Sequence, residues 1–150
     1  MQHKRQTQQG FTVVELMTVV VILGILVAIG SVNLIGAQVR AKEAATRTNM
    51  HQLQSAVAIY AVDYNGTYPA RIEALNEDPV TNLNKMQNPF DRKTGLGAAY
   101  DNEDSAQKPA GLITLEITQE DDKPVYRIFG YTSKAQRIQQ QERPFILSNA

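Results

Sequence analysis

One segment of the chain reads Leu16-Met-Thr-Val-Val-Val-Ile-Leu-Gly-Ile-Leu-Val-Ala-Ile29, and it begins a run of 24 residues, ending at Val39, that contains no charge. As a helix, a run of this length covers about 36 Å, which exceeds the roughly 30 Å of a bilayer's hydrocarbon core. A buried core helix would show a polar face, and this run shows none. The run therefore predicts a membrane-spanning helix.

A removable secretory signal is the alternative interpretation of the same run. Lys4 and Arg5 precede it, and Ala28-Ile29-Gly30 loosely resembles a cleavage site between small residues. However, the run is longer than the usual apolar region of about 7–15 residues, and Glu15 stands where that region should begin. The membrane-spanning interpretation is therefore favoured.

The composition excludes several classes of protein. Lys+Arg and Asp+Glu both number 15, and there is no Cys. This excludes a disulfide framework, a thiol nucleophile and a Cys-rich metal site, and the balanced charge does not indicate a nucleic-acid binder. No Gly-x-Ser-x-Gly, His-Glu-x-x-His or phosphate loop is present, and His51 stands alone on the helix. We expect no enzymatic activity and no cofactor.

Glu15 is the most informative single residue. A carboxylate inside the apolar part of a membrane helix costs about 2.5–3.5 kcal/mol, and less near the interface, so such a group is usually paired or functional. In the uncut chain Glu15 can lie at the headgroup boundary with its carboxylate in water. If the chain is cut before Phe11, a new positively charged α-amine arises four residues away, which makes a neutralising pair possible.

The segment Gln8-Gln9-Gly10-Phe11-Thr12-Val13-Val14-Glu15-Leu16 resembles the N-terminal methylation motif of type IV pilins and type II secretion pseudopilins. The resemblance implies that a prepilin peptidase removes residues 1–10 by cutting after Gly10, and that the same enzyme methylates the new N-terminal Phe11. It also implies that Glu15 pairs with the N-terminal amine of the neighbouring subunit as that subunit enters a filament.

Residues 11–39 would then serve first as a membrane anchor and later as the polymerisation helix, since an apolar helix removed from lipid must pack against copies of itself. Family helices usually carry a Pro within this segment, and Val32 stands there instead. Gly24, Gly30 and Gly36 provide sites for close packing or for local weakening of the helix, because each Gly costs about 1 kcal/mol relative to Ala.

The remaining chain predicts the α+β pilin fold, in which a long N-terminal helix packs on a small C-terminal antiparallel sheet. Residues 40–65 form the amphipathic half of the helix, with an apolar seam at Met50, Leu53, Val57, Tyr60 and Tyr64. Asn65-Gly66 ends it. Residues 66–111, with a short helical turn at 71–75, are expected to be a long surface connection.

Residues 112–150 are expected to form the sheet of the head. Residues 112–118 and 125–129 alternate as the arms of a hairpin, residues 131–138 extend it or begin another strand, and residues 145–147 close the sheet. Acidic runs at 101–104 and 120–122 would bind calcium only if the fold gathered them, and they lack a spaced ligand pattern. We therefore assign no metal site.

These features predict a structural subunit of a type IV pilus-like filament. The alternatives are the major pseudopilin of a type II secretion system and a membrane-anchored, non-polymerising ligand-binding module. The pilin is favoured because the distinctive loop of major pseudopilins is not evident after the helix. The resemblance implies as partners copies of the chain, the prepilin peptidase, membrane lipid, an inner-membrane assembly platform and its ATPase. It places the N-terminus in the cytoplasm and the head in the periplasm before assembly, and the filament at the cell surface afterwards.

Overall fold

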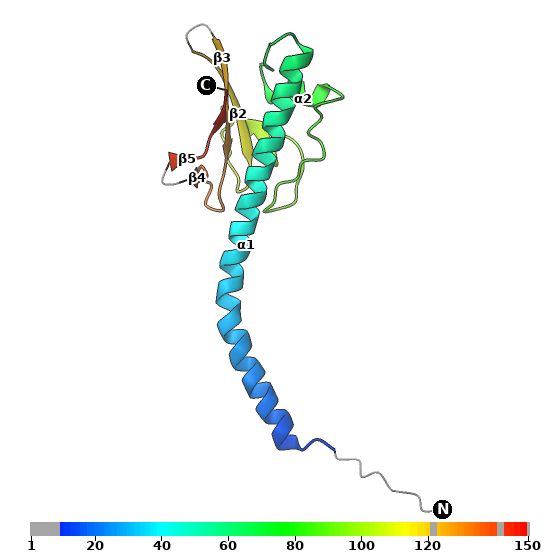
Figure 1. Cartoon of the computed structure of the whole chain (residues 1–150), viewed down its shortest axis with the longest axis vertical. Helices are drawn as coiled ribbons and strands as arrows, with labels where there is room; N and C mark the ends of the chain where they lie inside the picture. The colour runs from blue at the N-terminus through cyan, green and yellow to red at the C-terminus, as the bar shows by residue number, and fades with distance from the viewer. Residues whose placement is uncertain (1–9, 121–122, 141–142, 150) are drawn as a thin grey trace, which may run out of the picture. The chain divides into compact units, whose positions relative to one another are not determined.

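A computed structural model describes residues 10–120, 123–140 and 143–149. Helix α1 runs from Val13 to Asp63, 51 residues, close to the two predicted halves at 11–39 and 40–65. The chain divides into two compact units between Gln38 and Val39. The first contains the apolar half of α1, and the second, called the head below, contains the amphipathic half and all the strands (Figure 1).

The end of α1 follows from the two residues that the sequence marks as a stop. Asn65 and Gly66 have φ angles of +54° and +85°, in the left-handed region that closes a helix. The Gly66 amide donates to the Ala61 carbonyl at 2.6 Å, and the Tyr64 amide donates to the Tyr60 carbonyl at 3.0 Å. These bonds satisfy carbonyls of the last turn, so the predicted stop is confirmed.

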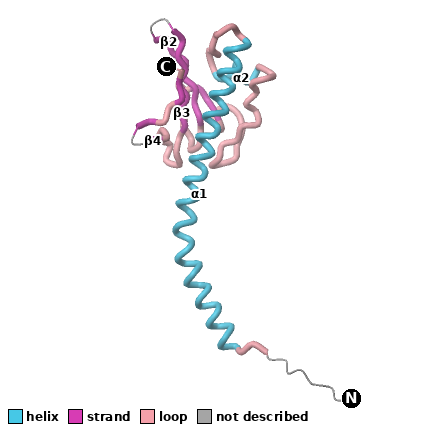
Figure 2. The backbone as a smooth tube through the Cα atoms, in the orientation of Figure 1, coloured by secondary structure: helices cyan, strands magenta, loops and turns pink. Residues whose placement is uncertain are grey.

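The sheet of the head confirms the predicted α+β fold class. Strands β2 (Ile113–Glu120) and β3 (Lys123–Gly130) form an antiparallel hairpin, and β6 (Leu147–Ser148) pairs antiparallel with β3. The short strand β1 (Tyr100–Asn102) pairs parallel with β2, which gives the order β1-β2-β3-β6. Two further strands, β4 (Gln139–Gln140) and β5 (Arg143–Pro144), form a separate ribbon (Figure 2).

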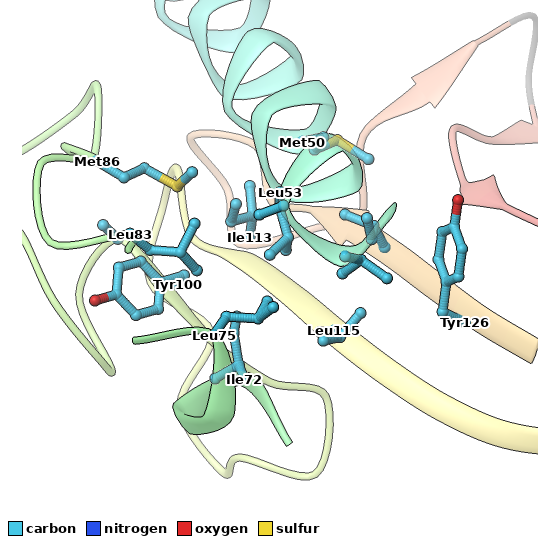
Figure 3. Close-up of a cluster of buried hydrophobic side chains, with 14 residues drawn as sticks. Met50, Leu53, Ile72, Leu75, Leu83, Met86, Tyr100, Ile113, Leu115 and Tyr126 are labelled. Carbon is cyan, nitrogen blue, oxygen red and sulfur yellow. The ribbon is translucent and has the colours of Figure 1, made fainter. Parts of the chain in front are cut away.

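The core lies between the sheet and the amphipathic half of α1. Met50, Leu53 and Val57 are fully buried, as the seam predicts, and they pack with Ile113 and Ile128 of the sheet (Figure 3). Such burial contributes about 1.5–3 kcal/mol per side chain. The seam fades toward its end, where Tyr60 is partly buried.

The tyrosines after the seam differ from one another in exposure. Tyr64 is 48% exposed and stacks on Tyr60 with 4.1 Å between ring centroids. Tyr68 instead meets Tyr126 of the sheet edge to face at 5.2 Å. Packing against the sheet therefore accounts for Tyr60 and Tyr68, and Tyr64 lies outside the core.

The prediction that residues 66–111 form a surface connection is wrong in part. Helix α2 (Ile72–Glu77) agrees with the short helical turn predicted at residues 71–75. Strand β1 was not predicted, and six apolar side chains of the segment are at least 94% buried: Ile72, Leu75, Leu83, Met86, Ala99 and Tyr100. Single apolar residues spaced irregularly each fill one gap in the core, so they leave no helical or strand period in the sequence.

The C-terminal region also differs from its prediction. Residues 131–138 form a turn, not a strand: the Thr132 amide donates to the Gln136 carbonyl at 2.8 Å, and Ala135 has a φ of +56°. The end of the chain does close the sheet, through β6 and through Asn149, whose side chain accepts from the Tyr126 amide at 2.9 Å. These contacts hold the tail in a chain without cysteine.

Candidate assembly and processing site

The helix begins with a reciprocal capping arrangement between Thr12 and Glu15. The Thr12 amide and the Thr12 hydroxyl donate to Glu15 Oε2 at 2.9 and 2.8 Å, and the Glu15 amide donates to Thr12 Oγ1 at 3.3 Å. The Leu16 amide donates to the Thr12 carbonyl at 3.3 Å, which is the first bond of the helix. This is a capping box, with Thr12 as N-cap and Glu15 at the third helical position.

The capping box leaves half of the carboxylate available. Both donors from Thr12 meet Oε2, and within the part of the chain that the structure describes Oε1 accepts no hydrogen bond. A carboxylate in the first helical turn is also stabilised by the positive end of the helix dipole. Glu15 therefore caps its own helix with Oε2, and its Oε1 has no donor among the described residues.

The peptide bond after Gly10 lies before the helix, in backbone without regular structure. Gly10 is exposed and nothing lies within 4 Å of a Cβ built on it, and the Phe11 side chain is 87% exposed. Exposed, irregular backbone near a terminus is the kind of segment that a peptidase can bind. Residues 1–9, the rest of the predicted leader, lie outside the described residues.

The apolar half of α1 buries none of its large side chains against the chain itself. From Phe11 to Ile35 those that the structure describes are between 47% and 87% exposed. The helix is long and apolar enough to cross a membrane by length and composition. An apolar surface of this size on a stable protein is covered by lipid or by another protein.

Two of the three predicted helix-packing glycines have empty surroundings within the chain. Nothing lies within 4 Å of a Cβ built on Gly24 or Gly30, and α1 continues without interruption past these positions and Gly36. The fold of the single chain therefore does not require glycine at positions 24 and 30. Close packing against a neighbouring helix stays a prediction.

The head contains a buried carboxylate that the sequence does not mark. The Glu103 side chain is 14% exposed and receives hydrogen bonds from Thr114, from Tyr131 at 2.9 Å, from Lys108 at 3.2 Å and from Arg137 at 2.6 Å. Burial by itself would raise the pKa of Glu103, but these four donors outweigh it and hold the pKa below its usual range. The cluster ties the turn after β3 to β1 and β2, which is a structural role.

The acidic runs of the sequence are engaged by basic side chains of the chain itself. Asp104 pairs with Arg71 at 3.1 Å, and Glu120 pairs with Arg127. Across the described ranges no three His, Cys, Asp or Glu side chains gather as a metal site would require. Asp121 and Asp122 lie outside the described residues.

Sequence reasoning found Gly10, Phe11 and Glu15 but overlooked Thr12. The signal was present, because Thr12-Val-Val-Glu15 has the Thr-x-x-Glu spacing of a capping box directly before an apolar run. The Glu103 cluster had no comparable signal. Its donors are spread over residues 108–137 and meet only in the folded head.

Comparisons with known proteins match two sequence families. The family described as the prokaryotic N-terminal methylation motif matches residues 5–31. The family described as type II secretion system protein G matches residues 33–121. The second match extends over the connection between helix and sheet, which is the segment that seemed to lack the pseudopilin pattern. No solved structure matches the chain.

Curated relatives agree with both matches. The chain is 38% identical over 72 residues to the type II secretion system core protein G of Klebsiella michiganensis, covering 48% of this chain and 50% of the relative. It is 39% identical over 72 residues to the core protein G of Vibrio cholerae, covering 48% and 49%. The type IV major pilin protein PilA of Myxococcus xanthus is 48% identical over 48 residues, or 32% of this chain and 22% of the pilin. The chain thus spans about half the length of the core proteins it matches.

Proposed function

The chain belongs to the family of type II secretion system protein G, and from this premise we propose that it is a pseudopilin, the structural subunit of a filament of such a secretion system. The sequence alone favoured a surface pilus. We now favour the pseudopilin, because the family match covers the helix-to-sheet connection. The single observation that carries the proposal of a filament subunit is the contrast between an apolar half-helix, whose described large side chains are all exposed, and a head with a complete core.

The proposed assembly begins with processing. Prepilin peptidase cuts after Gly10 and methylates the amine of Phe11, in the exposed segment that precedes the capping box. Residues 11–39 anchor the subunit in the inner membrane, with the head in the periplasm. The assembly platform and its ATPase then move the subunit from lipid into the filament, where neighbouring helices replace lipid around the apolar side chains.

Glu15 links the two environments in this proposal. Its Oε2 caps its own helix, and its free Oε1 accepts from the N-terminal amine of the neighbouring Phe11. Because an unpaired carboxylate inside a helix bundle is costly, this pairing selects one axial position of the incoming subunit. The protein performs no chemistry on a substrate in this role.

The test is to express the full chain together with type II secretion assembly components and to examine filaments by electron microscopy. Glu15→Ala should leave the subunit in the membrane but reduce filaments by at least about tenfold. Glu43→Ala is the matched control, because it removes a carboxylate from the same helix outside the apolar run. Normal filaments from Glu15→Ala would refute the role given to Glu15.

Mass spectrometry of the mature protein tests the processing step separately. We expect the chain to begin at Phe11 and to carry one added methyl group at its amine. A chain that keeps residues 1–10, or that begins at another residue, would contradict this step even if filaments form.

A type IV pilus subunit is the second candidate, since the pilin of Myxococcus xanthus shares 48% identity over 48 residues with this chain. The two candidates differ in the location of the filament: a pilus lies on the cell surface, and a pseudopilin filament lies in the periplasm. Labelling intact cells with an antibody against the head separates them, because a surface pilus is labelled and a periplasmic filament is not.

A further inference from the structure

The two ends of the head carry opposite charge. At the end where α1 enters, exposed or half-exposed basic side chains come from three separate segments and form what we call the basic surface: Arg40, Lys42, Arg47, Arg92, Lys134 and Arg143. Contacts place these segments together. Arg47 donates to the Gln139 carbonyl at 2.8 Å, and Lys42 lies 5.4 Å from the Phe90 ring centroid. The turn after β3 and the β4–β5 ribbon lie at this same end of the head (Figure 1).

Within the described residues, most of the basic surface has no anionic partner. Two described carboxylates, Glu43 and Asp91, lie near these basic residues in the sequence. Asp91 pairs with Lys93 at 3.6 Å, and Glu43 forms no salt bridge within the described residues. Within the described residues Arg40, Arg92, Lys134 and Arg143 form no salt bridge. Arg47 and Lys42 lie over the uncharged rings of Phe145 and Phe90, respectively, and not beside a carboxylate.

At the opposite end of the head, Asp63, Glu77 and Asp78 form the acidic surface. Asp63 is the last residue of α1 and Glu77 the last of α2, and neither helix has a basic residue in its last turn. Carboxylates at helix C-termini face the negative end of the dipole, so this arrangement is unfavourable in the isolated chain. Carboxylates in this unfavourable position are expected where a partner molecule supplies a neutralising positive charge.

One basic group near the acidic surface is already engaged, because Arg71 pairs with Glu73 and Asp104. Lys85, which lines a hollow with Pro79 and Val80, forms no salt bridge within the described residues. Within the described residues none of the three carboxylates of the acidic surface forms a salt bridge. Asp78 instead accepts from the backbone amides of Val80 and Thr81, at 2.7 and 3.1 Å.

The two surfaces do not neutralise each other within one head. Arg40 and Asp63 are separated by 23 positions of the same helix, or about 35 Å at the standard rise. Screening at physiological ionic strength acts over about 8 Å. The charge of each surface is therefore not neutralised by the other surface of the same head.

We infer that the basic surface of one copy of this chain contacts the acidic surface of another copy in the filament. The inference rests on the proposed function and deepens it. In a helical filament every copy has the same orientation, so a lengthwise contact joins the two different ends of the head. Opposite charge at those ends favours this parallel stacking, whereas an antiparallel arrangement would bring like charges together.

Charge reversal followed by charge exchange tests the contact. Lys134→Glu with Arg143→Glu reverses part of the basic surface, and Asp63→Lys with Glu77→Lys reverses part of the acidic surface. Each pair should reduce filaments of the full chain by at least about tenfold in electron micrographs, because like charges then face each other. All four changes together should restore at least about half of the wild-type filaments. Lys85→Glu is the control: it reverses an exposed charge but leaves every residue of the two surfaces intact, so filament number should be unchanged.

A folding measurement separates assembly from stability. Asp63→Lys places a cation at the C-terminus of α1, so the acidic-surface variant should unfold at the same temperature as wild type or at a higher one. Filaments lost from a head of undiminished stability then report a lost contact. An acidic-surface variant that unfolds well below wild type and forms no filaments would count against the inference.

Three other results would overturn the inference. Wild-type filament numbers from both pair variants would show that the charges do not meet. A fourfold variant no better than either pair would show that they do not meet each other. If only the basic-surface pair loses filaments, that surface binds something else, such as anionic lipid headgroups. Absence of filaments from the wild-type chain would instead refute the proposed function itself.

Discussion

The two halves of α1 differ in what covers their apolar side chains. From Met50 to Val57 the helix buries an apolar seam against its own sheet, with three side chains at 0% exposure. From Phe11 to Ile35 the helix is even more apolar, and the large side chains that the structure describes there are 47% to 87% exposed. The head is therefore complete as a single molecule, whereas the apolar half is stable only in lipid or in an assembly. Substitutions should consequently act on folding in one half and on membrane insertion or assembly in the other.

The largest expected contrast is between Leu53→Ala and Leu23→Ala. Leu53 is fully buried, so its truncation should lower the free energy of unfolding of the head by about 2–5 kcal/mol. Leu23 is 54% exposed and supports no core, so its truncation should change that free energy by less than about 0.5 kcal/mol. Urea unfolding of the full chain in detergent, followed by tyrosine fluorescence, measures both. Equal effects would mean that the head and the apolar helix fold as one unit.

Glycine substitutions sharpen the same comparison. Gly111 has a φ of +79°, and a Cβ there would lie 2.2 Å from Asn88 Oδ1. The Asn88 side chain cannot easily move, because its Nδ2 donates to the carbonyls of Ala98 and Ala110, both at 2.8 Å. Gly111→Ala should therefore destabilise the head by about 2–4 kcal/mol.

Gly24→Ala is the matched substitution in the apolar half. It meets nothing within 4 Å, so it should leave the unfolding of the head unchanged. Any loss it causes must appear in filament assembly, where a neighbouring helix approaches position 24. Normal assembly of Gly24→Ala would remove the packing role predicted for this glycine.

Acid should weaken the head through Glu103. Four donors hold its pKa below the usual value despite burial, so the ionised form stabilises the folded state. This contribution is complete above the unfolded pKa of about 4.3 and is lost as the pH falls below that value toward the folded pKa. Glu103→Gln should lower the unfolding temperature at pH 7 and should flatten its decline between pH 5 and pH 3. An unchanged slope would show that other carboxylates control the acid response.

The sequence predicted the regular parts of the molecule and overlooked the irregular ones. The period of Met50, Leu53 and Val57, the stop at Asn65-Gly66 and the two arms of the β2–β3 hairpin follow from local patterns, and all three are confirmed. Burial along β2 does not alternate as the sequence pattern does. Strand β1 has three residues and pairs in parallel, so no local period marks it. The donors of Glu103 are likewise brought together only by tertiary packing.

The candidate site divides in the same manner. Gly10, Phe11 and Glu15 were found through a resemblance to a motif, and their roles in processing and assembly remain predictions. Thr12 was missed although its spacing to Glu15 is a purely local signal. The motif was interpreted only for contacts between subunits, so the capping of the helix by Thr12 and Glu15 within one subunit was missed.

The smallest expected effect therefore concerns Thr12. Thr12→Ala removes the donor hydroxyl and the cap for the Glu15 amide, which should weaken the first helical turn by about 1 kcal/mol. Hydrogen exchange of the Glu15 and Leu16 amides in detergent micelles should accelerate about fivefold, and the head should be unaffected. Thr12→Ser keeps the hydroxyl and should exchange at the wild-type rate.

The same variant distinguishes the two duties of Glu15. If Glu15 caps its own helix with Oε2 and meets the neighbouring amine with Oε1, loss of Thr12 loosens the carboxylate but leaves its charge for assembly. Filaments of Thr12→Ala should then persist at reduced number, whereas those of Glu15→Ala should be lost. Equal loss from both variants would show that a correctly oriented carboxylate, and not its charge alone, is what the incoming subunit requires.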